Sequence, residues 1–111
     1  MKINRVFTLL MFVVLINITY SYDLTGKWYC DDGGTYYIRQ VGNELFWYGE
    51  GLDWTNVAHG KVSGNYIILS WADVPKAAFM NEGILILRII SSNKLQAVYK
   101  TGGFAGSIWW R

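Results

Sequence analysis

The sequence predicts an all-β fold: an eight-stranded antiparallel up-and-down β-barrel, a meander with a closed end of tight turns and an open end of long loops. From Leu24 to Arg111, glycine- and asparagine-rich turns recur every ~8–12 residues between short runs of β-branched and aromatic side chains. No stretch in this range keeps a helical period. The connections also alternate between short and long, as expected when each strand pairs with the next.

Each expected strand is a run of these side chains bounded by turn residues. In chain order the strands are Leu24–Cys30, Thr35–Val41, Glu44–Gly49, Val57–Val62, Asn65–Asp73, Ile84–Ser91, Lys94–Thr101 and Phe104–Arg111. Only the segment from Pro75 to Glu82 carries a helical signal, because proline suits a first helical position and Gly83 suits a helix end. We expect at most a turn or two of helix there.

The connections divide into two sets, because alternate connections of a meander lie at the same end of the barrel. One set contains the two-residue turns Gly42-Asn43, Ser63-Gly64 and Ser92-Asn93, which are typical of hairpins. The other set contains Asp31–Gly34, the longer Glu50–Asn56 and Val74–Gly83 segments, and Gly102-Gly103. One end is therefore expected to be sealed and the other to form an open mouth.

Charge follows the same division. Acidic residues gather at the long-loop end: Asp31, Asp32, Glu50, Asp53, Asp73 and Glu82. Basic residues gather toward the tight-turn end: Arg39, Lys61, Arg88, Lys94 and Arg111. This predicts an acidic mouth, although acidic loops are also common simply because loops are solvated.

Turn geometry predicts which side chains share a face, because directly opposed residues lie on the same side of a sheet. Two-residue turns at Gly102-Gly103 and Ser92-Asn93 predict an inward set of Ile84, Ile86, Ile90, Leu95, Ala97, Tyr99, Phe104, Ile108 and Trp110. The outward set then contains Gln96, Lys100, Ser107 and Arg111 together with Leu85, Leu87, Ile89 and Trp109. Such an apolar outer wall favours self-association, so a homo-oligomer is a possible state.

The first residues are typical of a secretory signal peptide. Residues 1–5 form a basic region that contains Lys2 and Arg5, Val6 to Ile18 form a mainly apolar run, and Thr19-Tyr20-Ser21 offers small residues for cleavage after Ser21. The apolar run is shorter than the ~20 residues that a membrane span needs. We therefore expect residues 1–21 to be removed, a single β-barrel domain over residues 22–111, secretion to the extracellular space, and no membrane span afterwards. An uncleaved anchor is the alternative.

Composition narrows the partners of the mature domain. The chain has 10 Lys and Arg and 8 Asp and Glu, and two of the basic residues, Lys2 and Arg5, lie in the leader. The remaining charges balance, which argues against nucleic acid as a partner. The sequon Asn17-Ile18-Thr19 lies in the leader, so no N-glycan is expected.

Cys30 is the single cysteine, so the chain forms no internal disulfide. Stability must come from burial instead, and aromatic residues make up 17% of the chain. We expect Cys30 to be a buried, inert thiol, with an intermolecular disulfide as the alternative.

The segment Leu24-Thr25-Gly26-Lys27-Trp28 resembles the first strand of the calycin group, which includes avidin-like and lipocalin-like barrels. In that group a Gly-x-Trp begins the first strand at the closed end, and an arginine of the last strand packs on the tryptophan. The resemblance implies structural roles for Gly26, Trp28 and Arg111.

Avidin itself places an asparagine and a serine against biotin two and six residues after this tryptophan. The chain has Cys30 and Gly34 there, so the resemblance does not extend to biotin. The segments DGGTYYIRQ, WADVP and TGGF, which begin at Asp32, Trp71 and Thr101, resemble a set of small uncharacterised secreted proteins. That likeness implies no activity.

A barrel of eight strands is just wide enough to be filled by side chains or to hold one small ligand. Aromatic residues predicted near the mouth are Tyr37, Tyr48, Trp54, Trp71 and, less directly, Trp47, and the carboxylates beside them are Glu50, Asp53 and Asp73. Aromatic faces beside carboxylates suit sugars or organic cations. The alternative is that these rings are packed core.

Neither a metal nor a cofactor is expected. The carboxylates Asp31, Asp32, Glu50 and Asp53 lack the spacing of a calcium loop, and the chain has too few His and Cys residues for zinc. Pairing rules place Arg39 and Arg88 toward the interior, where each needs a partner or a rim position.

The sequence carries no convincing catalytic constellation, and we expect no enzyme. A Cys30–His59 thiolate pair and a glycosidase-like pair of Glu50 and Asp73 are the alternatives. The first functional hypothesis is a secreted non-enzymatic barrel that binds a small hydroxylated or cationic ligand at its open end. The second is a carbohydrate- or protein-binding module that acts through outer aromatic residues, either alone or as an oligomer.

Overall fold

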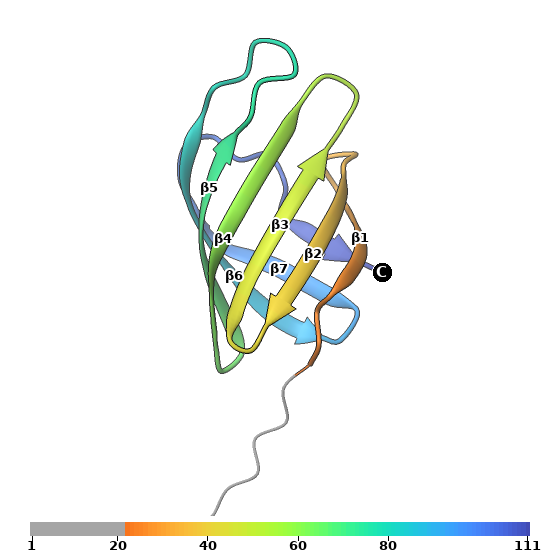
Figure 1. The fold of residues 1–111 in the computed structure, drawn as a ribbon. Coiled ribbons are helices and arrows are strands. Elements are labelled where there is room, and N and C mark those ends of the chain that lie inside the picture. Colours follow the sequence, from red (N-terminus) through yellow and green to blue (C-terminus); the bar gives the residue numbers. More distant parts are fainter. Residues whose placement is uncertain (1–21) are drawn as a thin grey trace, which may run out of the picture.

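A computed structural model describes residues 22–111 and confirms the predicted fold class. Eight antiparallel strands form a closed barrel in the order β1 to β8 (Figure 1). Their bounds are β1 Gly26–Cys30, β2 Thr35–Val41, β3 Glu44–Glu50, β4 Thr55–Ser63, β5 Tyr66–Asp73, β6 Glu82–Ser91, β7 Lys94–Lys100 and β8 Ile108–Trp110. The segment from Pro75 to Asn81 is irregular and contains no helix. The expected signal peptide, with its sequon, lies outside the described residues.

Each strand pairs with the next, and β8 returns to β1 through Tyr29↔Trp110 and Cys30↔Trp109. The three tight turns follow the closing pairs Val41↔Glu44, Ser63↔Tyr66 and Ser91↔Lys94. The middle turn is therefore Gly64-Asn65, one residue later than expected. Gly42 and Gly64 begin their turns with φ of 61° and 60°, a backbone conformation that glycine adopts without steric cost.

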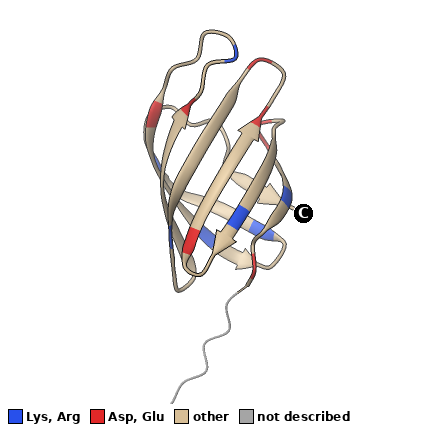
Figure 2. Cartoon of the chain, in the orientation of Figure 1, with Lys and Arg blue, Asp and Glu red and all other residues tan. Residues whose placement is uncertain are grey.

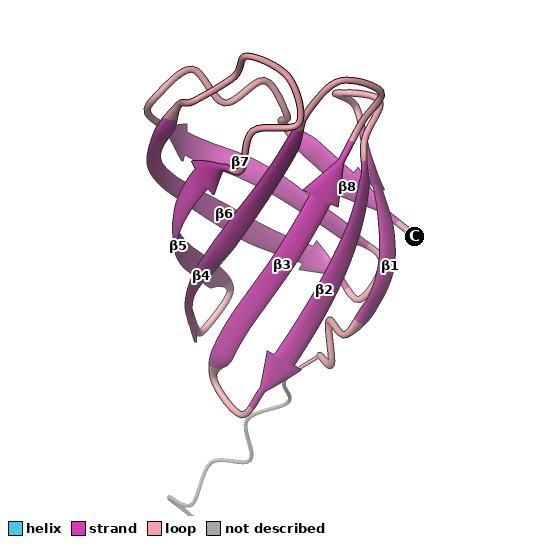
Figure 3. Cartoon of the chain, turned by 45° about the horizontal axis from the view of Figure 1, so that its top comes forward, coloured by secondary structure: helices cyan, strands magenta, loops and turns pink. Residues whose placement is uncertain are grey.

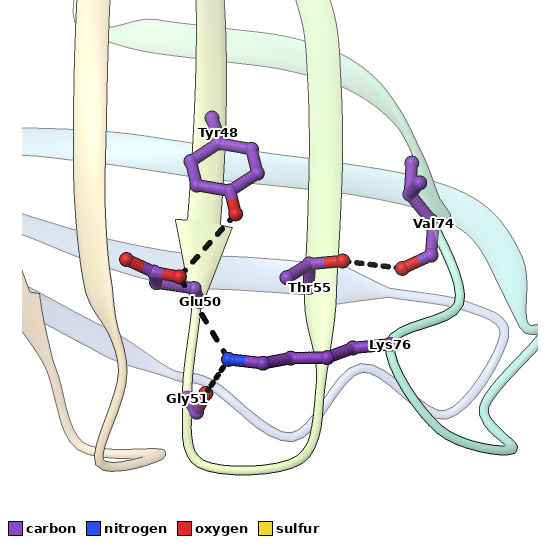
Figure 4. A network of polar contacts seen from close by, with 6 residues as sticks. All are labelled: Tyr48, Glu50, Gly51, Thr55, Val74 and Lys76. Atoms are coloured by element: carbon purple, nitrogen blue, oxygen red, sulfur yellow. Dashed lines mark hydrogen bonds and ion pairs between the residues drawn. The ribbon is translucent and has the colours of Figure 1, made fainter.

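The two long loops meet at the same end of the barrel, as the alternation predicts (Figure 3). The amide N–H of Val74 donates to the carbonyl of Thr55 at 3.0 Å, and the Thr55 hydroxyl donates back to the Val74 carbonyl. Lys76 Nζ donates to the Gly51 carbonyl at 3.2 Å (Figure 4). These contacts fix the β5–β6 loop against the β3–β4 loop.

The barrel interior is filled by apolar side chains that alternate with exposed ones along the strands. The buried apolar residues are Leu24, Trp28, Cys30, Tyr36, Ile38, Leu45, Trp47, Ala58, Ile67, Leu69, Trp71, Leu85, Leu87, Ile89, Leu95, Phe104 and Trp109. Leucines and isoleucines contribute most of the β5–β7 side of this core, whereas aromatic rings gather around Trp109.

The predicted faces of the last three strands were partly wrong. Leu85, Leu87, Ile89 and Trp109, expected on the outer wall, are buried in the core. Ile84, Ile90, Tyr99 and Trp110, expected inside, are exposed, and Ile86 and Ile108 are half-buried. Leu95 and Phe104 face inward as expected, and Ala97 packs against the core.

Two β-bulges and one long connection explain these differences. Because side chains alternate between the two faces of a sheet, a register shift of one residue moves the inward-facing side chains of a strand to the outer face. The ladder skips Ile90 between Ile89↔Leu95 and Ser91↔Lys94, and it skips Val98 between Leu87↔Ala97 and Ile86↔Tyr99. The last strand begins only at Ile108, so the connection after β7 is much longer than a two-residue turn.

Arg39 and Arg88, expected inside, are both exposed. Tyr36 and Ile38 occupy the inward positions of β2, so Arg39 faces outward. The Ile90 bulge reverses the face of Arg88 in β6. Neither arginine therefore needs a buried partner.

The floor of the barrel is built around Trp28, which is fully buried. Its Nε1 donates to the Leu24 carbonyl at 2.8 Å, and the Arg111 guanidinium lies over the ring at 4.5 Å, the contact that the calycin resemblance implies. Arg111 also donates to the carbonyls of Asp23, Thr25 and Ser92. A Cβ at Gly26 would approach Arg111 Nη1 to 3.2 Å, so glycine leaves room for this arginine.

The seam between β8 and β1 is held by the carboxylate of Asp31. Its Oδ1 accepts the amide hydrogens of Ser107 at 2.8 Å and Ile108 at 3.2 Å. Lys100 Nζ donates to Ser107 Oγ at 2.8 Å and strengthens the same corner. Desolvation alone would raise the pKa of Asp31, but the hydrogen bonds that its carboxylate accepts from the two backbone amides and from the Cys30 thiol together outweigh it and hold the pKa below its ordinary value.

This seam predicts a contribution to acid sensitivity. Because the folded-state pKa of Asp31 lies below 3.8, its ionised form stabilises the fold above that pH, and the contribution is lost as the pH falls toward the folded value. Asp31→Asn should therefore show a smaller drop in unfolding free energy between about pH 6 and about pH 2 than the wild type. Urea unfolding at both pH values measures it, and equal drops in the two proteins would contradict this role of Asp31.

Candidate functional site

A cavity of about 180 Å³ opens at the long-loop end of the barrel. Its walls come from four connections and the strand ends beside them. The lining residues are Asp32, Trp54, Asn56, Trp71, Asp73, Phe79, Asn81, Gly103, Phe104 and Ala105. A volume below the ~300–1,000 Å³ of drug-sized pockets fits a small ligand.

Aromatic side chains form much of the wall. Trp71 of β5 and Phe104 of the β7–β8 connection pack edge to face at 4.9 Å. The Nε1 of Trp71 donates to the Thr101 carbonyl at 3.1 Å, which fixes its orientation. Phe79 of the β5–β6 loop lines the cavity while remaining 48% exposed. The cavity therefore has two packed rings at its base and a third at its rim.

The fourth ring, that of Trp54 in the β3–β4 loop, packs against the β1–β2 loop because two glycines leave space for it. A Cβ atom on Gly34, in the β1–β2 loop, or on Gly51, in the β3–β4 loop, would overlap the indole. The ring also lies 6.0 Å from that of Tyr36, which is part of the core. Trp54 is thus an ordered part of the wall despite being in a loop.

We expect Gly51→Ala to displace Trp54. Gly51 does not have a positive φ, so the added methyl group acts by steric overlap with the indole and not through backbone strain. The expected cost is ~1–3 kcal/mol of stability, as for other overpacked sites. Intrinsic fluorescence and chemical unfolding measure the change. Leu52→Ala is the control in the same loop, because Leu52 is 95% exposed. Identical spectra for both variants would contradict the wedged position of Trp54.

A chain of hydrogen bonds runs from the cavity into the core. Asp32 Oδ2 accepts the Tyr36 hydroxyl at 2.5 Å, and the Tyr36 oxygen accepts from Asn56 Nδ2 at 3.5 Å. Asn56 Oδ1 in turn accepts from Trp47 Nε1 at 2.9 Å. Burial and the bond to Asp32 raise the pKa of Tyr36 well above its ordinary value, so Tyr36 stays a neutral donor.

The second carboxylate, Asp73, pairs with Asn56 at the open ends of β4 and β5. Its Oδ2 accepts the amide hydrogen of Asn81 at 2.9 Å, and its own amide donates to the Asn81 carbonyl at 2.8 Å. These bonds close the base of the β5–β6 loop. Asp73 is thereby fixed at the cavity wall, at the base of the loop that carries Phe79.

The charge around the mouth is mainly negative, as the sequence predicts (Figure 2). The cavity lining contains two acidic residues and no Lys or Arg. Lys76 also lies at this end, apart from the basic residues of the tight-turn end, and its Nζ lies 3.9 Å from Glu50 Oε2 (Figure 4). Lys100 is held at the seam by Ser107. Both nearby cations are therefore engaged outside the cavity.

The structure brings together three of the predicted ligand-binding residues, Trp54, Trp71 and Asp73. Tyr37 and Tyr48 instead lie on the outer face of β2 and β3, where their rings stack at 6.3 Å. Glu50 faces the same side and accepts the Tyr48 hydroxyl at 3.3 Å. Asp53 is exposed at the tip of its loop, outside the lining, and Trp47 is buried in the core.

Asp32, Asn56, Phe79, Asn81 and Phe104 line the cavity without having been chosen as site residues. Asp32 carried a usable signal, since it lies in a loop of the predicted open end. Asn56 would have followed from the correct β4–β5 turn, because the closing pair Ser63↔Tyr66 places it opposite Asp73. Phe79 and Asn81 lie in an irregular loop, where no sequence period indicates side-chain direction.

The two residues of each catalytic alternative lie in different surroundings. Cys30 is buried, and burial raises the pKa of its thiol strongly, whereas His59 lies on the outer face against Phe46 at 4.5 Å. Glu50 contacts Lys76 outside the cavity that Asp73 lines. Within residues 22–111, no three His, Cys, Asp or Glu residues converge as metal ligands.

A scan against family models, a search of curated proteins and a search of solved structures each found no match to this chain. Across the described part of the chain, no helix has the length and apolar character to cross a membrane.

Proposed function

We propose that the protein is a secreted, non-enzymatic binding barrel that takes a small hydroxylated or cationic ligand in the cavity at its open end. The observation that carries the proposal is the lining itself, in which four aromatic rings stand beside two carboxylates. Ring faces stack on the apolar faces of sugars or attract cations, and carboxylates form charge-assisted hydrogen bonds with either class. The packed barrel below the cavity supplies a rigid support.

The closed end supports a place for the chain among calycin-type barrels. A Gly-x-Trp at the start of β1, with Arg111 of the chain end over the ring, matches the arrangement that the resemblance implies. The residues that would hold biotin in avidin are replaced by Cys30 and Gly34, and Cys30 is buried. We therefore propose a relationship in scaffold with a different ligand.

The basic and apolar leader supports secretion with cleavage after Ser21. Mass spectrometry of the exported protein should give a mature chain beginning at Tyr22. Retention of residues 1–21 on the exported or membrane-bound protein would contradict this proposal.

The binding proposal is tested by tryptophan fluorescence during titration with a panel of monosaccharides and small amines. Phe79→Ala removes a rim ring without opening the core and should weaken binding about fivefold. Tyr48→Ala is the matched control, since its ring is exposed on the outer wall, and it should leave binding unchanged. A panel with no binder in the millimolar range would contradict the proposal.

The outer wall of β2–β4 favours a second candidate, a carbohydrate- or protein-binding module. The stacked Tyr37–Tyr48 and Phe46–His59 pairs present aromatic faces to solvent. The same titration decides between the two, because this candidate predicts loss of binding in Tyr48→Ala and none in Phe79→Ala.

We also propose self-association, through an apolar outer surface made of different residues from those expected from the sequence. The outward side chains of β5–β7 include Ile68, Ile84, Ile90, Val98 and Tyr99, all exposed. Such a surface suits a second copy of the chain. Sedimentation velocity at several concentrations tests it, and a monomer throughout would contradict it.

A further inference from the structure

We infer that the open-end cavity selects a small organic ammonium ion over an uncharged ligand of the same shape. This inference rests on the proposed function and narrows its ligand class. The carrying observation is that two carboxylates and four aromatic rings line one small cavity that no Lys or Arg side chain lines.

The lining polar groups have already used much of their hydrogen-bonding capacity. Asp32 accepts from the Gly34 amide at 2.8 Å and from the Tyr36 hydroxyl at 2.5 Å. Asn56 bonds Trp47 through its oxygen and Tyr36 through its nitrogen, and the Trp71 N–H is bound to a backbone carbonyl. A polyhydroxylated ligand needs several free donors and acceptors, which this lining offers sparingly.

The negative charge of the lining, in contrast, is not consumed by these contacts. The donors to Asp32 and Asp73 are neutral amides and a phenol, so neither carboxylate has a cationic partner in the cavity. Of the two nearby lysines, Lys76 lies against Glu50 and Gly51 on the outside, and Lys100 is held at the seam by Ser107. A ligand cation would therefore supply the missing positive charge.

The rings favour an organic cation over a metal ion. Trp54, Trp71, Phe79 and Phe104 present π-systems whose faces attract an ammonium or alkylammonium group, and tryptophan is the strongest such partner. A bare divalent ion would instead need several converging ligands, and within residues 22–111 no three His, Cys, Asp or Glu side chains converge as such a group. The cavity volume of about 180 Å³ limits the ligand to a few heavy atoms beyond the ammonium group.

The test is calorimetric titration of the protein with three probes. These are choline, its uncharged isostere in which a tert-butyl group replaces the trimethylammonium group, and methyl glucoside. Choline should bind at least about tenfold more tightly than the isostere, and added salt should weaken choline alone. Asp73→Asn keeps the shape of the side chain and should weaken choline about tenfold with the isostere unaffected. Asp53→Asn, outside the lining, is the matched control and should leave both unchanged.

Equal affinity for choline and its isostere would overturn the inference and leave the binding proposal standing. Binding of methyl glucoside without choline would do the same. An unfolded Asp73→Asn variant does not decide the matter, because the isostere comparison on the wild-type protein stands alone. If all three probes and the wider panel of sugars and amines fail to bind, both the inference and the proposed function fail.

Discussion

Replacement of Trp28 by alanine should destabilise the barrel by ~3–5 kcal/mol, the largest effect expected of any single side chain. Trp28 is fully buried, so the change removes a large apolar surface and leaves a cavity in the floor. It also leaves the Leu24 carbonyl without its donor and the Arg111 guanidinium without the ring beneath it. For a small domain whose whole stability is ~5–15 kcal/mol, such a loss approaches unfolding.

Urea unfolding of matched variants measures this effect. Trp110→Ala, at a position 44% exposed on the neighbouring β8, should cost less than about 1 kcal/mol. Trp28→Phe and Trp109→Phe give a finer comparison, because both rings are fully buried but the Trp109 N–H has no partner among the described residues. Trp28→Phe should cost ~1 kcal/mol more than Trp109→Phe, since it alone breaks a hydrogen bond. Equal costs at Trp28 and Trp110 would contradict the closed-end arrangement.

Removal of the Asp32 carboxylate should be the most costly change at the mouth. Asp32→Ala leaves the Tyr36 hydroxyl and the Gly34 amide without their acceptor in a partly buried site. Hydrogen bonds to charged groups contribute ~1.5–3 kcal/mol each, so a loss of about 3 kcal/mol in stability is expected. Asp53→Ala, which removes an exposed carboxylate at a loop tip, should cost less than about 0.5 kcal/mol.

A double-mutant cycle separates the Asp32–Tyr36 bond from other effects. Asp32→Ala, Tyr36→Phe and the double variant should give a coupling free energy of ~1–3 kcal/mol, measured by urea unfolding. If the two changes are additive, the hydrogen bond between Asp32 and Tyr36 does not stabilise the mouth.

The architecture was predictable because it rests on local signals. Turn residues at Gly42 and Gly64, and alternation of buried and exposed side chains in β2 to β5, required no knowledge of distant contacts. The division into short and long connections then placed the Glu50–Asn56 and Val74–Gly83 segments at one end. The bonds between Thr55 and Val74 join these segments.

The faces of the last strands were not predictable in the same way. Tight turns fix the register only where the ladder is continuous, and the bulges at Ile90 and Val98 interrupt it. A bulge follows from how a strand bends to close the barrel, which is a tertiary requirement. The β7–β8 connection was unpredictable for a similar reason. The Gly102-Gly103 pair is typical of a hairpin turn, but the chain continues to Ile108 before the next strand begins.

The sequence predicted the end of the barrel at which the site lies, but only some of the residues that line it. Trp71 and Asp73 could be found because they end a strand at the long-loop end. Tyr37 and Tyr48 also belong to strands that reach the long-loop end. Their positions in the alternation of buried and exposed side chains, however, direct them to the outer wall. The cavity residues of the irregular loops depend on contacts such as that of Trp54 with Gly34, which only the folded chain brings together.

The most direct test of the open-end site is a two-dimensional amide NMR titration with the tightest-binding ligand of the panel. We expect shifts at the amides of Trp54, Asn81, Gly103 and Ala105 and at the Trp71 indole N–H. Signals from the closed-end turn residues Gly42, Asn43 and Ser92 should stay unchanged. Shifts centred on Tyr37 and Tyr48, or on the closed-end turns, would contradict it.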